Sequence, residues 1–75
     1  MNKERRKQID KIRNEIEKIK SNLEDVKIDE EITFSSMPEN LQYSMRGETS
    51  QDAINSMDCA IENLQSAIDN LDEII

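Results

Sequence analysis

The feature that most constrains this chain is a pair of segments in which apolar residues recur at alternating intervals of three and four. This seven-residue repeat keeps one stripe of a helix against a partner helix. The two segments therefore predict two long helices. We interpret their stripes as the core of an oligomer: Ile9, Ile12, Ile16, Ile19, Leu23 and Val26 in the first, and Ile54, Met57, Ile61, Leu64, Ile68 and Leu71 in the second.

Small residues widen the second stripe. Ala53, Ala60 and Ala67 each precede a stripe position by one residue, and Ile74 continues their spacing. Small side chains let a second helix approach closely. The second helix is therefore expected to contact two neighbours.

The whole chain, residues 1–75, is predicted to be a single all-α hairpin. The first helix is expected over about residues 3–33 and the second over about residues 50–75. Residues 34–49 form the connection, with a short helix inside it. Helix connections in bundles usually take ~2–8 residues, and longer connections are often functional.

Local signals place the ends of these helices. Ser36 followed by Pro38 indicates the start of the short helix, because proline is favoured in the first helical turn. Thr49 and Ser50 are expected to cap the second long helix. Gly47 suits a chain reversal just before that cap.

The charges favour an antiparallel arrangement. Residues 1–20 carry eight basic and four acidic side chains, whereas residues 21–75 carry two basic and thirteen acidic ones, for a net charge of −7 over the chain. Cations at a helix N-terminus oppose the helix dipole. Folding back would bring Arg5, Arg6 and Lys7 near Asp69, Asp72 and Glu73, either within one hairpin or from another chain. The alternative is that the charged residues at both ends simply face solvent.

The size of the chain favours self-association. Seventy-five residues with one Phe, one Tyr and no Trp supply few large side chains for a core. We expect a homodimer that forms a four-helix bundle, or a higher even oligomer.

The composition argues against catalysis and metal binding. The chain has no histidine and one cysteine, Cys59, which is expected to be a small buried thiol beside Ala60. Common catalytic bases and zinc ligands are thus missing, so we expect no enzyme activity, no cofactor and no metal. No apolar run approaches the ~18 residues of a membrane helix. Because most of the chain is anionic, duplex nucleic acid is not an expected partner.

A binding site for a small anion is the sharper functional hypothesis. An arginine can hold a phosphate, a helix N-terminus can donate free amides, and a tyrosine can stack on a base. A basic turn from a neighbouring chain would complete such a pocket. The candidate residues are Tyr43, Arg46, Gly47, Thr49, Arg5 and Arg6. The alternative is that Arg46 pairs with Glu48 or Glu39 and Tyr43 packs on Leu41, which would only hold the loop in place.

The middle of the chain carries a resemblance. The run Met37-Pro38-Glu39-Asn40-Leu41-Gln42, then Ser44 and Arg46-Gly47-Glu48, together with Asn2-Lys3-Glu4-Arg5-Arg6-Lys7, resembles small acidic proteins of phages and prophages of Gram-positive bacteria. The resemblance covers almost the whole chain and implies a setting in the cytoplasm of a bacterial host. Relatives carry more glutamate in the second helix, where this chain has Ser56, Gln65 and Ser66.

These observations predict a non-enzymatic binding protein of a phage or prophage that acts on a host component. Its sharper form is counter-defence, in which an oligomer pocket sequesters a small nucleotide signal; this form is an analogy with other small phage proteins. The alternatives are a protein inhibitor that binds a host protein through its acidic helical face, as a nucleic-acid mimic would, and a purely structural coiled-coil protein.

Overall fold

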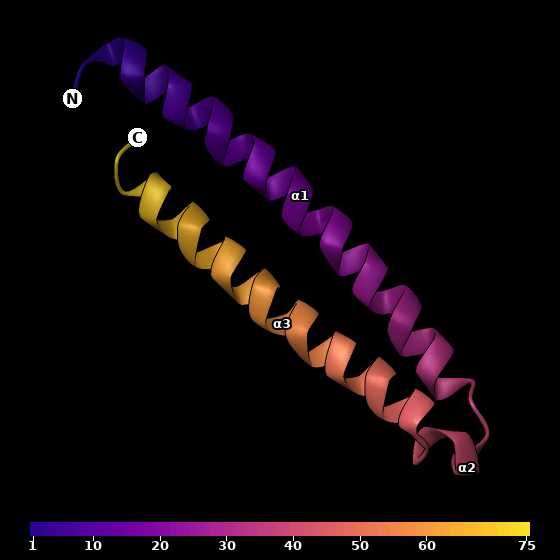
Figure 1. Ribbon diagram of the computed structural model, residues 1–75. Coiled ribbons are helices and arrows are strands. Elements are labelled where there is room, and N and C mark those ends of the chain that lie inside the picture. The colour runs from indigo at the N-terminus through magenta and orange to yellow at the C-terminus, as the bar shows by residue number, and fades with distance from the viewer.

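The computed structural model describes residues 1–75 and is a long helical hairpin. In chain order its elements are α1 (Lys3–Ser35), α2 (Glu39–Gln42) and α3 (Met45–Asp72). The two long helices lie antiparallel, α2 sits in the connection at one end, and both termini lie at the other end (Figure 1). The molecule measures 58 × 14 × 12 Å. The predicted all-α hairpin with a short connecting helix is therefore confirmed.

Helix α1 runs without interruption because it contains neither proline nor glycine. It begins after Asn2, whose Oδ1 atom accepts a hydrogen bond from the backbone amide of Arg5 at 2.8 Å. It ends at Ser35, two residues beyond the expected end. Pro38 follows three residues later, and a proline disfavours helical backbone angles in the residue before it, here Met37.

Helix α3 begins five residues earlier than the sequence predicted, so the connection comprises residues 36–44. Ser44 has extended backbone angles, and its carbonyl accepts the first helical hydrogen bond from the amide of Glu48 at 2.9 Å. Thr49, expected to be a cap, lies inside the helix and donates its hydroxyl to the carbonyl of Met45 at 2.9 Å. Ser50 is also inside the helix. The N-cap position belongs to Ser44, five residues earlier, whose hydroxyl donates to the carbonyl of Leu41 and does not cap α3.

Gly47 serves a close approach and not a chain reversal. It lies in the first turn of α3, is buried, and does not have a positive φ. A Cβ atom at this position would lie 2.1 Å from the carbonyl oxygen of Gln42 and 2.5 Å from that of Leu41. Helix α2 therefore packs its backbone directly on α3, which only glycine permits.

The core is one layer of side chains between α1 and α3. On α3, the predicted stripe faces α1: Ile54 and Ile68 are buried, and Met57, Ile61, Leu64 and Leu71 are half-buried. On α1, only alternate members of the predicted stripe do so. Ile9, Ile16 and Leu23 are half-buried, whereas Ile12, Ile19 and Val26 remain 49%, 56% and 55% exposed.

Candidate functional site

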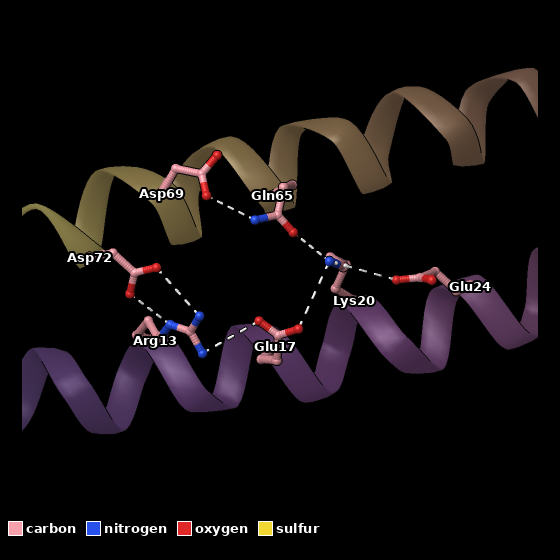
Figure 2. A network of polar contacts seen from close by, with 7 residues as sticks. All are labelled: Arg13, Glu17, Lys20, Glu24, Gln65, Asp69 and Asp72. Atoms are coloured by element: carbon pink, nitrogen blue, oxygen red, sulfur yellow. Dashed lines mark hydrogen bonds and ion pairs between the residues drawn. The ribbon is translucent and has the colours of Figure 1, made fainter.

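Three polar contacts at seven-residue intervals join the two long helices. The three pairs, here called the polar ladder, are Arg13 with Asp72, Lys20 with Gln65, and Lys27 with Asp58. The Nε atom of Arg13 lies 2.8 Å from Oδ1 of Asp72, and the two lysines each donate from Nζ to an oxygen of α3. Each step of seven residues along α1 is matched by a step of seven back along α3. The ladder thus fixes the antiparallel register. Figure 2 shows two of its contacts, Arg13 with Asp72 and Lys20 with Gln65.

Carboxylates on α1 flank the cations of the ladder. Glu17 lies 3.4 Å from Arg13 and 3.9 Å from Lys20, and Glu31 lies 3.9 Å from Lys27. The hydrogen bond to Asp72 raises the pKa of Arg13 above its ordinary value, and the nearby carboxylates add to this. The hydrogen bond to Asp58 raises the pKa of Lys27 in the same way. Both cations therefore remain charged throughout the neutral range.

The ladder explains why α1 turns half of its apolar stripe away from α3. Each cation follows an apolar stripe position by one residue, which corresponds to about 100° around a helix. Because the cations face α3, the preceding residues point outward. We call these three residues, Ile12, Ile19 and Val26, the apolar row.

The ladder residues were missed when the sequence was read only for apolar spacing and overall charge. The signal was present as two matching series, with donors at residues 13, 20 and 27 and acceptors at residues 58, 65 and 72. Opposing polar series with the same seven-residue spacing indicate a register-setting contact.

The apolar row shares one side of the hairpin with small residues of α3. Ala53, Ala60 and Ala67 also recur every seven residues, and the register of the ladder places Ala67 within one residue of the level of Ile19 and Ala60 within one residue of the level of Val26. A hollow of about 440 Å³ lies where these sides meet, because it is lined by Thr33, seven residues after Val26, and by Arg46, seven residues before Ala53. We call this surface, the apolar row together with the three alanines, the apolar face.

Cys59 lies outside the core. It was expected to be a buried thiol, but it is exposed. Met57 and Ile61 face α1, and Cys59 is two residues from each, which is about 200° around the helix. The spacing of its neighbours therefore turns this side chain toward solvent.

The candidate ligand residues are divided between the two ends of the molecule. Arg46 and Thr49 line the hollow, which also contains Glu30 and Ser50. The hydroxyl of Ser50 donates to Oε1 of Glu30 at 2.6 Å. Gly47 lies beneath α2. The remaining three candidates lie apart from the hollow: Tyr43 is 79% exposed, and Arg5 and Arg6 lie in the first turns of α1, at the far end of the hairpin.

One part of the alternative, in which this segment only holds the loop in place, differs from the structure. Arg46 forms no ion pair with Glu48 or Glu39. The connection is held instead by Gln42, whose Nε2 atom donates to the carbonyls of Phe34 and Met37, each at 3.2 Å.

The N-terminal turns of α1 extend beyond α3. The last contact of the ladder joins Arg13 to Asp72, where α3 ends, so residues 3–12, which make up about 15 Å of helix, lie beyond it. Figure 1 shows the N-terminal end of α1 reaching past the end of α3. This basic extension carries five basic and two acidic side chains. The expected approach of Arg5, Arg6 and Lys7 to Asp69, Asp72 and Glu73 does not occur as ion pairs within one chain, because the register places Arg13 at Asp72.

No cluster of three His, Cys, Asp or Glu side chains with the geometry of a metal site occurs. None of the helices has the length and apolar character needed to cross a membrane. No family model, curated protein or solved structure matches the chain.

Proposed function

We propose that the protein is a non-enzymatic binding protein that works as a self-associated helical bundle, with a second copy of the chain covering the apolar face. The observation that carries this proposal is the apolar row: Ile12, Ile19 and Val26 stand about half exposed at seven-residue intervals. This spacing is that of a helix contact surface.

The other half of the apolar face is suited to close contact. Alanines at residues 53, 60 and 67 leave room for a facing helix to approach α3. The thin core gives a reason for self-association, because only Ile54 and Ile68 are buried among the apolar side chains. Chains of this size often depend on oligomerisation for stability.

The bundle would hide the apolar faces and present the charged ladder faces outward. Its net negative charge suits it to a partner with a basic surface, by electrostatic attraction. The phage or prophage setting is what the resemblance of the middle motif implies, and within that setting a host protein is the partner that we propose. We favour this protein-binding role over nucleotide capture.

Nucleotide capture is the second candidate, and the presence of Arg46 and Thr49 in one hollow supports it. The carboxylate of Glu30 in the same hollow opposes it, since like charges repel. Isothermal titration with cyclic and linear nucleotides tests this candidate. Heat that is lost in Arg46→Ala supports capture, and the absence of heat across the panel rejects it.

Sedimentation equilibrium tests the self-association. The wild-type protein at about 100 µM is expected to sediment at twice the mass of one chain, and Ile19→Asp at the mass of one chain, because a buried carboxylate without a partner is strongly unfavourable. Ile28→Asp is the matched control: Ile28 is 52% exposed on α1 but lies off the apolar face.

Circular dichroism at the same concentration checks that both variants remain helical. A wild-type monomer would contradict the proposal. Dissociation by Ile28→Asp but not by Ile19→Asp would place the contact on the opposite side of α1.

A further inference from the structure

We propose that the two copies pack with their apolar faces together and their hairpin turns at opposite ends, so that α1 of one copy lies antiparallel to α1 of the partner. This arrangement rests on the proposed self-association and specifies the geometry of the contact. Three features carry it: the position of the charges, the basic extension and the centre of the apolar row.

All of the net charge lies in the half of the hairpin that contains the turn. Residues 21–59 carry two basic and nine acidic side chains, whereas residues 1–20 and 60–75 together carry eight of each. Turns at the same end would place two strongly acidic halves against each other. Turns at opposite ends place each acidic half against a half with no net charge, which reduces the repulsion.

The basic extension makes the opposite-ends arrangement attractive and not merely less repulsive. Residues 3–12 lie beyond the last contact of the ladder, and apart from the half-buried Ile9 their side chains are exposed in their own chain. In the antiparallel pair the basic extension lies against the half of the partner that contains the hairpin turn, where the acidic side chains are concentrated. With turns at the same end, both extensions would project together and repel each other.

The apolar row sets the register of the pair. Ile19 is the midpoint of α1, which runs from Lys3 to Ser35, and it is also the centre of the apolar row. A two-fold axis at Ile19 therefore overlaps the two α1 helices along their full length. It places Ile12 against Val26 of the partner subunit.

The same register brings together candidate residues that one chain keeps apart. Seven residues before Ile12 is Arg5, and seven after Val26 is Thr33, which lines the hollow. Arg5 would therefore lie at the rim of the hollow of the partner subunit, within reach of Glu30 of the partner subunit. The basic extension of one copy thus completes the hollow of the other.

Distances between two spin labels test the arrangement. The label is placed by Tyr43→Cys, at an exposed site in the connection, in a Cys59→Ser background so that no other thiol is labelled. Counting the helical rise from Ile19 to the turn in each copy, the labels of an opposite-ends dimer lie about 50–60 Å apart. The labels of a same-end dimer lie within about 30 Å.

Double electron–electron resonance gives this distance, and sedimentation of the labelled protein reports the mass in parallel. A dimer with a long distance supports the arrangement. A dimer with a distance below about 30 Å overturns it and leaves the proposed self-association intact. A monomer with no dipolar coupling overturns both.

Discussion

At the scale of single residues, three cations decide which way α1 faces. The side chain of Lys20 is only 17% exposed, although it is charged. Lysine and arginine cover apolar surface with their methylene groups while their charged ends reach polar partners. Arg13, Lys20 and Lys27 therefore contribute packing as well as charge to the contact between the helices.

The raised pKa of Lys27 defines where its charged contact matters. A cation whose pKa is higher in the folded state stabilises the fold at pH values below its unfolded pKa. This contribution is lost as the pH rises through the folded pKa, which lies above the ordinary value for lysine. The contribution of the charged Lys27 contact to the stability of the fold is therefore constant across the neutral pH range.

Replacing the only glycine tests the close approach of α2 to α3. We expect Gly47→Ala to lower the free energy of unfolding by about 1–3 kcal/mol, because its Cβ would collide with backbone atoms that must shift. Urea denaturation at a fixed protein concentration measures this change. Ser56→Ala, at an exposed position of α3, is the control and should change little. Alanine ordinarily favours helix over glycine, so a more stable Gly47→Ala variant would show that the contact is absent.

At the scale of the helices, apolar spacing predicted the elements and the contact stripe of α3 better than the rotation of α1. It predicted both long helices and the stripe of α3 that contacts α1, and the alanine spacing indicated a second contact surface on α3. It could not predict how α1 is rotated, because apolar spacing treats Arg13 and Lys20 as solvent-facing. The earlier start of α3 was missed because Ser44 and Thr49 are both plausible caps, and the local sequence does not rank them.

The middle contact of the ladder can be exchanged for an apolar pair. We expect the double variant Lys20→Leu with Gln65→Leu to raise the free energy of unfolding by about 1–3 kcal/mol, because well-packed apolar residues often stabilise more than buried polar pairs. The outer contacts, Arg13 with Asp72 and Lys27 with Asp58, should maintain the register.

Urea denaturation measures the effect of this exchange. Lys18→Leu, at an exposed position of α1, is the control for an added leucine. A double variant less stable than the wild type would mean that the polar contact itself holds the helices together.

At the scale of the whole molecule, the charge distribution makes the arrangement of two copies sensitive to salt. The neutral half of each hairpin includes the basic extension, and the other half carries the whole net charge. Ions screen such interactions, with a Debye length of about 10 Å at 0.1 M salt. The sign of the salt effect therefore distinguishes the two arrangements.

Raising NaCl from 50 to 500 mM is expected to increase the dissociation constant of the dimer about tenfold, because screening weakens the attraction between the basic extension and the acidic half. Sedimentation equilibrium over this range measures the change. A dimer that tightens with salt would instead indicate that the acidic halves lie together.

The seven-residue repeat of the ladder makes the hairpin divisible in length. Excising residues 14–20 together with residues 65–71 would leave Arg13 opposite Asp72 and Lys27 opposite Asp58, now one repeat apart. The hairpin would shorten by about 10 Å, and the two remaining contacts of the ladder would keep their partners. The length of this protein can therefore change by whole seven-residue repeats in both long helices, while the contacts between the helices stay the same.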